Sequence, residues 1–170
     1  MKMRFIFVML ILSCISIVLY GCSDTYKDVI RIHIRANSNE MCDQDVKYVV
    51  RDSIVEYITP LIIDAKNVVE VKNILENNIP GIEDTANTVL VAQGYEYRAT
   101  ATIKNEYFPT RVYGEYSFPA DYYDALVINL GTGTGDNWWC VAYPPLCFVG
   151  NGSGDVVYKS KILEIIDRYF

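Results

Sequence analysis

The sequence has 170 residues, of which 51% are hydrophobic and 21% charged, and its formal net charge at pH 7 is −6. A chain of this length and hydrophobic content can bury the core of one globular domain. Because the chain is acidic and has no basic cluster, its composition argues against binding to nucleic acid or to an anionic lipid surface.

The first 21 residues have the pattern of an export signal. Lys2 and Arg4 precede an apolar run from Phe5 to Tyr20. As a helix this run would span about 24 Å, less than the ~30 Å hydrocarbon core of a bilayer. A positive start, a short apolar segment and small residues after it are typical of a secretory signal. We therefore predict an export signal at residues 1–21, a short tether at 22–28 and one folded domain at 29–170.

Cys22 ends the segment Leu19-Tyr20-Gly21-Cys22, which resembles the lipobox of bacterial lipoproteins. In that pattern the cysteine is lipidated and becomes the first residue of the mature chain. Tyr20 departs from the pattern, in which a small residue is usual at this position. Two alternatives stay open: lipidation at Cys22, or a signal that is uncleaved or conventionally cleaved.

Residues 29–35 alternate in polarity, with isoleucines at every second position between Arg31, His33 and Arg35. This period of two predicts a strand with one buried face. His33 is the single histidine of the chain. Because it lies between two arginines on the polar side, we expect it to face solvent.

Three helices are expected after this strand. Each has apolar residues at the spacing of an amphipathic helix and is bounded by a cap, a proline or a glycine. The predicted boundaries are Cys42 to Pro60, with Ser38 or Asn39 as the cap; Asn67 to Asn78; and Ile82 to Gln93, opened by Pro80 and followed by Gly94.

The hydrophobic period changes to two at Tyr95, which predicts strands in the second half of the chain. The order of a strand, three helices, a run of strands and a final helix predicts a single α+β domain with a mostly antiparallel sheet. The predicted elements are a strand at Tyr95–Lys104, a tight turn at 105–106, strands at Tyr107–Tyr113 and Ala125–Leu130, and a C-terminal amphipathic helix at Val156–Phe170.

Residues 131–148, GTGTGDNWWCVAYPPLCF, form the most unusual segment. Its glycines permit backbone angles that other residues avoid, and Pro144 and Pro145 each fix φ and remove a donor. We expect an aromatic-rich loop here rather than a helix or a central strand. Cys140 and Cys147 lie at the two ends of the diproline turn and can close it as a disulfide in an exported chain.

Two alternatives to the Cys140–Cys147 disulfide stay open: two free buried thiols, or a zinc site with Cys42 and His33. The zinc site would need four ligands from remote segments, without the close cysteine spacings that such sites use. Cys42 is otherwise expected to be a small buried residue at the start of a helix.

No motif assembles a catalytic set, so we expect neither an enzyme nor a cofactor. A hydrolase dyad of Cys140 and His33 requires a free thiolate, which the predicted disulfide excludes. The GTGTG segment lacks the Gly-Lys-Ser/Thr ending and the following helix of a phosphate loop. Asp121 and Asp124 are close carboxylates, but a turn after Pro119 explains them equally well.

Four segments together resemble the stage II sporulation protein R family. They are VIRIHIRANS at 29–38, VRD at 50–52, FPTRVYG at 108–114 and NWWCVAYPPLCF at 137–148, and they occur in the family's order. The similarity covers residues 29–149, and its last segment is the most specific.

The resemblance implies a developmental signal of endospore-forming bacteria, with residues 29–170 as the signalling domain. Members of the family are made in the forespore and exported into the space between the forespore and mother-cell membranes. There they activate a membrane-embedded aspartic protease of the mother cell, which cleaves the precursor of sigma-E. A lipid on Cys22 would tether the signal to the membrane and raise its local concentration. An envelope lipoprotein that binds a small ligand is the alternative class.

A ligand of this kind would bind one state of its receptor better than the other. We expect aromatic residues of the 131–148 segment to contact the receptor, because such residues dominate interface energetics, and Arg111 to lie beside them or to stack on a tryptophan. The alternative is that both tryptophans belong to the core. The receptor-binding candidates are Trp138, Trp139, Tyr143, Phe148 and Arg111.

Overall fold

The structure is a computed structural model, and it describes residues 28–113 and 116–144 of the chain. Several predicted features lie outside these residues. They are the export signal, Cys22, Cys147, Phe148 and the C-terminal helix at 156–170.

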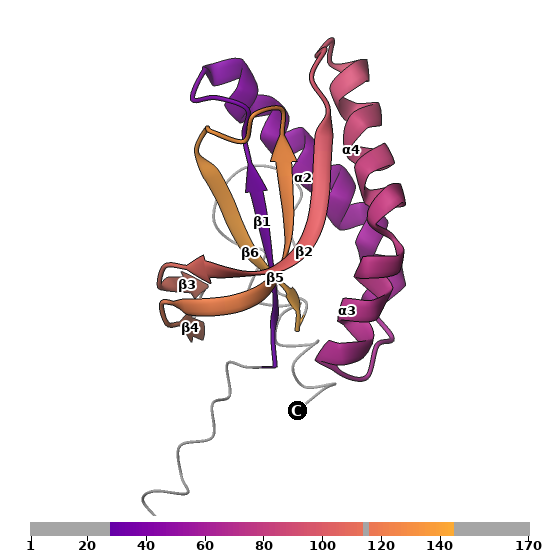
Figure 1. The fold of residues 1–170 in the computed structure, drawn as a ribbon, viewed down its shortest axis with the longest axis vertical. Helices are drawn as coiled ribbons and strands as arrows, with labels where there is room; N and C mark the ends of the chain where they lie inside the picture. Colours follow the sequence, from indigo (N-terminus) through magenta and orange to yellow (C-terminus); the bar gives the residue numbers. More distant parts are fainter. Residues whose placement is uncertain (1–27, 114–115, 145–170) are drawn as a thin grey trace, which may run out of the picture.

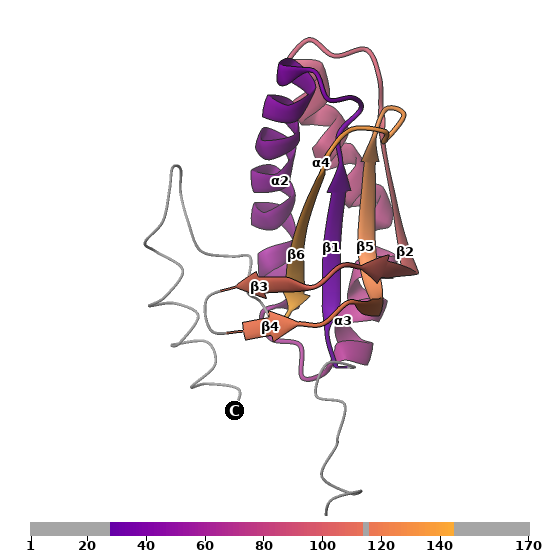
Figure 2. The ribbon, with the colours of Figure 1, turned by 90° about the vertical axis from the view of Figure 1, so that its left-hand side faces the viewer.

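The described residues form two layers, a β-sheet and a set of helices that covers one of its faces (Figure 1). The sheet has four strands in the order β2-β5-β1-β6. On the opposite face a two-stranded hairpin crosses one end of the sheet (Figure 2). The elements are β1 (Ile30–Arg35), α2 (Met41–Ile62), α3 (Val68–Asn77), α4 (Ile79–Ala92), β2 (Ala99–Phe108), β3 (Arg111–Tyr113), β4 (Tyr116–Phe118), β5 (Asp121–Leu130) and β6 (Asn137–Tyr143).

The pairing of the strands confirms the predicted α+β class with a mostly antiparallel sheet. β2 pairs antiparallel with β5, and β6 pairs antiparallel with β1. β1 and β5 pair in parallel. Parallel neighbours need a long crossover between them, and here the helical layer and β2 to β4 supply it.

The prediction that only one face of β1 is buried is wrong. The isoleucines of β1 pack against the helices as predicted, but Arg31 and His33 are only 0% and 1% exposed. Phe108 and Phe118 belong to a second core cluster on that face. β1 is therefore a central strand with an apolar face and a buried polar face, and His33 does not face solvent.

α2 extends beyond both of its predicted ends. It begins at Met41, and the cap residue is Glu40 rather than Ser38 or Asn39; the N–H of Glu40 donates to Ser38 Oγ at 3.1 Å. At the other end Pro60 lies inside the last turn instead of ending the helix. Pro60 donates no hydrogen bond, but the N–H of Ile63 still donates to Thr59 O at 3.1 Å, and the helix continues to Ile62.

α3 and α4 follow the prediction more closely. Asn67 caps α3, because its side chain accepts a hydrogen bond from the N–H of Glu70 at 2.9 Å. α4 begins at Ile79 rather than Ile82, since Pro80 lies within its first turn, where a missing N–H costs nothing. Gly94 has a φ of 83° just beyond the helix, as predicted.

The strand predicted at Tyr95–Lys104 lies at Ala99–Phe108, and it runs straight through the turn predicted at 105–106. Tyr95 and Tyr97 precede the strand, and their rings pack against the helix-side core. This packing gives them the alternation of a strand although their backbone is not part of one. The chain reverses instead after Phe108, and the next long strand, β5, starts at Asp121 rather than Ala125.

The loop predicted at 131–148 is wrong for its middle part, because residues 137–143 form strand β6. β6 lies at one end of the sheet and carries both tryptophans and Cys140. Aromatic residues and valine favour strands, and the glycines and Pro144 bound this strand rather than belonging to it. The Tyr143–Pro144 peptide bond is cis.

The glycine-rich turn between β5 and β6 packs directly on the turn that follows β1. Thr132 and Thr134 donate from their hydroxyls to the carbonyl oxygen of Asn37 at 2.8 and 2.9 Å, and the Gly135 N–H donates to Ala36 O at 2.9 Å. A Cβ on Gly135 would lie 2.2 Å from the carbonyl oxygen of Ser38. The two turns approach so closely that only glycine fits at this position.

We predict that Gly135→Ala destabilises the fold by about 2–3 kcal/mol, because the backbone of Ser38 must move to admit the methyl group. Gly94→Ala is the matched control, since its Cβ would meet nothing within 4 Å and only the positive φ opposes it. That cost is about 1–2 kcal/mol. Urea denaturation of the two variants measures the difference, and equal costs would contradict the close packing of the turns.

Candidate functional site

The guanidinium of Arg31 lies buried between the sheet and the β3–β4 hairpin. Its Nε donates to Cys140 O at 3.0 Å, and its Nη2 donates to the hydroxyl of Tyr113 at 3.2 Å. That hydroxyl in turn donates to Trp139 O at 3.1 Å. One buried cation therefore connects β1, β3 and β6. The same cation also lies close to four aromatic rings. The distances from the guanidinium carbon to the ring centroids are 4.5 Å for Phe108, 5.8 Å for Tyr113, 5.1 Å for Phe118 and 5.1 Å for Tyr123.

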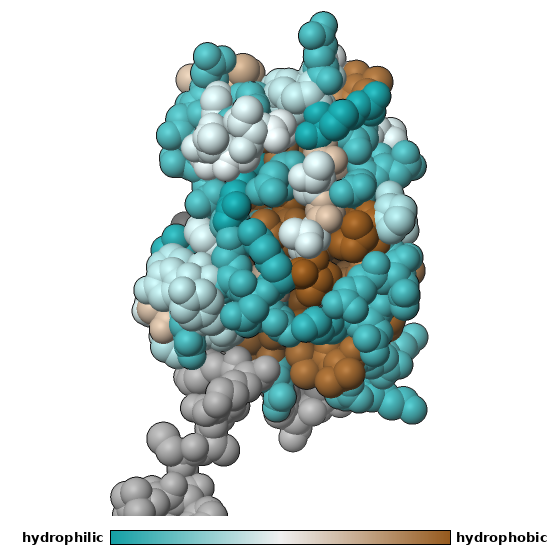
Figure 3. Space-filling model, in the orientation of Figure 1, coloured by the Kyte–Doolittle hydropathy of each residue, from teal (hydrophilic) through white to brown (hydrophobic). Residues whose placement is uncertain are grey.

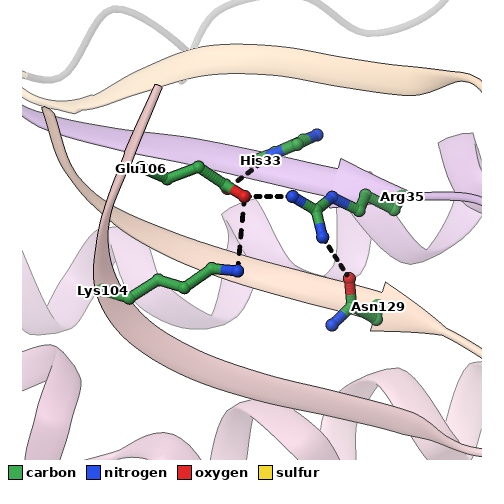
Figure 4. A network of polar contacts seen from close by, with 5 residues as sticks. All are labelled: His33, Arg35, Lys104, Glu106 and Asn129. Carbon is green, nitrogen blue, oxygen red and sulfur yellow. Dashed lines mark hydrogen bonds and ion pairs between the residues drawn. The ribbon is translucent and has the colours of Figure 1, made fainter. Parts of the chain in front are cut away.

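His33 and Arg35 of β1 meet Glu106 of β2 on the same face of the sheet (Figure 4). His33 Nδ1 lies 2.8 Å from Glu106 Oε2. Arg35 bonds to Glu106 Oε1, and Lys104 Nζ lies 3.3 Å from the same oxygen. A carboxylate can only accept hydrogen bonds, so we assign the proton of the neutral imidazole to Nδ1.

Burial lowers the pKa of His33, and the hydrogen bond to Glu106 only partly opposes this effect. For Glu106, burial acts to raise the pKa, but the hydrogen bond from His33 and the positive charge of Arg35 hold the pKa below its ordinary value. At neutral pH the pair is thus a neutral imidazole beside an ionised carboxylate. His33 is enclosed rather than open to a substrate.

The two tryptophans lie on opposite faces of β6. Trp139 is on the hairpin side, where it stacks on His33 at 3.7 Å between ring centroids and at an angle of 19°. Its ring also packs edge-on against Phe108 at 4.8 Å. The guanidinium of Arg111 lies 5.8 Å from the Trp139 centroid, which is the stacking considered for it from the sequence. Trp139 therefore joins the core of this face, as the second interpretation of the tryptophans expected.

Trp138 is on the helix side of β6, where its ring is half-buried and packs against the helix-side core beside α2. The guanidinium of Arg51 lies 5.6 Å from its ring centroid and 5.0 Å from that of Tyr48. Tyr48 is 43% exposed. Tyr48, Arg51 and Trp138 thus form a stacked array at the surface, which we call the α2–β6 patch. Tyr143, at the end of β6, packs partly against the helix-side core.

Cys140 and His33 do not form a dyad. Cys140 is paired with Ile32 across the β1–β6 ladder, whereas His33 is paired with Trp139. Directly opposed residues point to the same face of a sheet, so the Cys140 side chain lies on the helix side and the His33 ring on the hairpin side. The predicted partner of Cys140, Cys147, lies outside the described residues, so the disulfide stays a prediction.

The other predicted site residues have structural roles or lie at the surface. Cys42 is exposed at the start of α2, which corrects its expected burial. Among residues 28–113 and 116–144, no three potential ligands come together as a metal site. Asp124 forms an ion pair with Lys72 at 2.6 Å, and Asp121 is exposed. In the GTGTG segment, the N–H and the hydroxyl of Thr132 donate hydrogen bonds to Asn37.

Sequence reasoning missed Arg31, Tyr113 and Glu106 as parts of this site. A period of two distinguishes the two faces of a strand but does not tell which of them is buried. The available signal was the aromatic content of residues 107–123, because a hairpin rich in aromatic residues can cover a buried arginine.

We predict that His33→Gln removes a pH dependence of stability that begins as the pH falls below about 6.5. The folded protein keeps His33 neutral, whereas the unfolded chain takes up a proton near pH 6.5. The contribution of neutral His33 to the free energy of unfolding is therefore fully present above that pH and is lost as the pH falls below it. One proton gives a slope of at most about 1.4 kcal/mol per pH unit. Urea denaturation at several pH values measures it.

Glu106 does not confuse this measurement, because its lowered pKa affects stability only as the pH falls below about 4.5. The chain has a single histidine, so no other imidazole titrates in the window. Equal slopes for the wild type and His33→Gln would contradict the neutral, buried state of His33.

No helix within residues 28–113 and 116–144 is long and apolar enough to cross a membrane.

Comparison with known protein families matches residues 26–153 to the family described as stage II sporulation protein R. The stage II sporulation protein R of Bacillus subtilis (strain 168) is 35% identical over 135 residues, which are 79% of this chain and 60% of the relative. The chain thus spans well under two thirds of that relative's length. No solved structure matches it. The matched region includes every strand and helix described above, and the chain belongs to the stage II sporulation protein R family.

Proposed function

We propose that this protein is an extracytoplasmic signal of endospore formation, which activates the membrane-embedded mother-cell protease that processes the sigma-E precursor. The observation that carries this proposal is the family match over residues 26–153. The chain would be exported into the space between the two membranes, and a lipid on Cys22 would tether it there.

The arrangement of the family-like segments supports a shared functional region. The segments at 29–38, 50–52, 108–114 and 137–148 are far apart in the sequence. In the described residues they meet around β1 and β6, where Arg31 contacts Tyr113 and Cys140, and where Arg51 and Arg111 each lie over a tryptophan. The family-like residues therefore build and flank one strand, β6.

Within this region, the α2–β6 patch is the part best suited to bind a receptor. Trp138 and Tyr48 present aromatic surface with a cation between them, and these residue types are enriched among those that dominate binding energy. Trp139 and Arg111 are better suited to position β6, because Trp139 is enclosed by His33 and Phe108. Tyr143 and Phe148 stay proposed contacts at the end of the same strand and beyond it.

We predict that Trp138→Ala keeps the fold but abolishes activation of the protease, whereas Trp139→Ala destabilises the fold by about 3 kcal/mol. Trp138 packs with one face on the helix-side core and stacks with Arg51, whereas Trp139 packs between the sheet and the hairpin against His33 and Phe108. Thermal unfolding and precursor cleavage should be measured for both variants. Full activity of a folded Trp138→Ala variant would remove the patch from the proposal.

The function itself is tested by reconstitution in a host that does not sporulate. The sigma-E precursor and its processing protease are co-expressed with this chain, either intact or lacking residues 1–21, and cleavage is followed by immunoblot. We expect cleavage only with the intact chain, because the signal must reach the far side of the membrane.

Absence of cleavage by well-exported protein with a cognate protease would contradict the proposal and favour an envelope lipoprotein that binds a small ligand. The cysteine hydrolase alternative receives no support from the geometry, since Cys140 and His33 lie on opposite faces of the sheet.

A further inference from the structure

β2 is an edge strand of the four-stranded sheet, and α4 covers only the first part of the outer edge of β2. The N–H of Ala99 donates to Asn87 Oδ1, and the N–H of Ala101 donates to Glu83 Oε1, each at 2.8 Å. Both acceptors belong to α4. The backbone groups of odd-numbered residues in β2 therefore point away from β5 and towards the outside of the sheet.

The same alternation directs the backbone groups of Ile103, Asn105 and Tyr107 outwards, and no backbone partner for them occurs within residues 28–113 and 116–144. β2 bends away from α4 towards this end (Figure 1). An open edge of this kind is a template for pairing with another strand.

The residues along this edge are complementary to themselves. In an antiparallel pair of two copies centred on Asn105, Lys104 of one copy lies opposite Glu106 of the other. Ile103 then lies opposite Tyr107, and both contacts occur twice by symmetry. Lys104 Nζ already lies 3.3 Å from Glu106 Oε1 of its own chain, and the two side chains are 41% and 15% exposed. The strand pair would therefore bring the Lys104 of the second copy next to an existing ion pair, and opposite charges at directly opposed positions stabilise a strand pair.

The two ends of such a pair also match. In the same register Ala101 lies opposite Pro109 of the second copy. Pro109 has no N–H to donate, and the N–H of Ala101 is already bonded to Glu83. The ladder would therefore end without an unpaired donor at the point where α4 begins to cover the edge.

Exposed aromatic side chains next to this edge support the same arrangement. Tyr107 and Tyr122 are 52% and 65% exposed, and their rings contact each other at 5.6 Å on the helix side of the sheet. Apolar surface also follows the seam between β2 and the α3–α4 layer (Figure 3). A second copy placed by the strand pairing would bring its own Ile103 and the start of its α4 next to the tyrosines.

We propose that two copies of this chain form a symmetric dimer in which their β2 strands pair antiparallel about Asn105, joining the two sheets into one. The inference rests on β2 and its neighbours, and it does not depend on the proposed function. The second copy is favoured over an unrelated strand because the charge and apolar pattern of residues 103–107 complements itself.

We predict that Asn105→Cys forms an intermolecular disulfide in the full, exported chain. Opposed residues of a hydrogen-bonded antiparallel pair have Cα atoms about 5.5 Å apart, within the range of disulfides. The experiment uses a Cys42→Ser background to remove the exposed thiol, and the product is detected on a non-reducing gel. Thr102→Cys is the matched control, because in this register residue 102 lies opposite residue 108 and not its own copy.

Sedimentation of the purified chain at up to about 100 µM supplies the second measurement. We expect a reversible monomer–dimer equilibrium that Lys104→Glu and Asn105→Pro each weaken more than about tenfold, through like-charge contact and loss of the central outward N–H. Lys66→Glu is the control for the charge change at another exposed lysine.

A wild-type chain that stays monomeric over this range would overturn the proposal. So would a dimer that survives both β2 variants, or equal cross-linking of Asn105→Cys and Thr102→Cys, which would indicate a different interface. Circular dichroism checks that each variant is folded. A wild-type chain that dimerises but does not activate the protease would count against the proposed function and not against the dimer.

Discussion

The buried guanidinium of Arg31 is the interaction on which the hairpin side of this molecule depends. A charge removed from water is costly unless it is paired or hydrogen-bonded. Here the Cys140 carbonyl and the Tyr113 hydroxyl supply hydrogen bonds, and four aromatic rings supply a polarisable surface around it. Because these partners come from β2, β3, β4, β5 and β6, the cation has them all only when the hairpin and β6 are both in place; its Nη1 is buried without a hydrogen-bond partner among the described residues, so the aromatic rings compensate part of the burial cost.

The same dependence links Trp139 to the rest of the sheet. The Tyr113 hydroxyl that accepts from Arg31 donates to the Trp139 carbonyl, and the Trp139 ring lies on His33. His33 is in turn oriented by Glu106. The position of β6, and with it of Trp138 on the other face, therefore follows from contacts made by the polar side chains of β1.

Much of the fold could be predicted from the sequence because its helices and strands carry clear periods and end signals. Asn67, Gly94 and the isoleucines of β1 behave as local physical chemistry expects. The errors arise where tertiary contacts decide. The β3–β4 hairpin buries the face of β1 that carries polar residues. Around Tyr97 the sequence alternates between apolar and polar residues because the Tyr97 ring packs on the core, although residue 97 is not part of a strand.

The candidate site was less predictable than the fold. Trp138 and Trp139 are adjacent in the sequence. They lie on opposite faces because residues 137–143 form a strand, which the sequence analysis did not predict. That separation gives them different neighbours: Trp138 packs on the helix-side core beside Arg51, and Trp139 stacks on His33. Cys140 and His33 are separated by the same alternation. Chain order shows none of these relations without the register of β1 and β6.

The placement of β1 at the centre of the sheet has a consequence for the order of folding. Arg31 pairs with Ala125 and with Val141, so the first strand of the domain finds both its neighbours near the other end. Such distant pairings give a high contact order and slow folding. In a chain that crosses a membrane from its N-terminus, β1 would emerge first and stay unpaired until β5 and β6 had followed. The four-stranded sheet would therefore not be complete until β6 had followed.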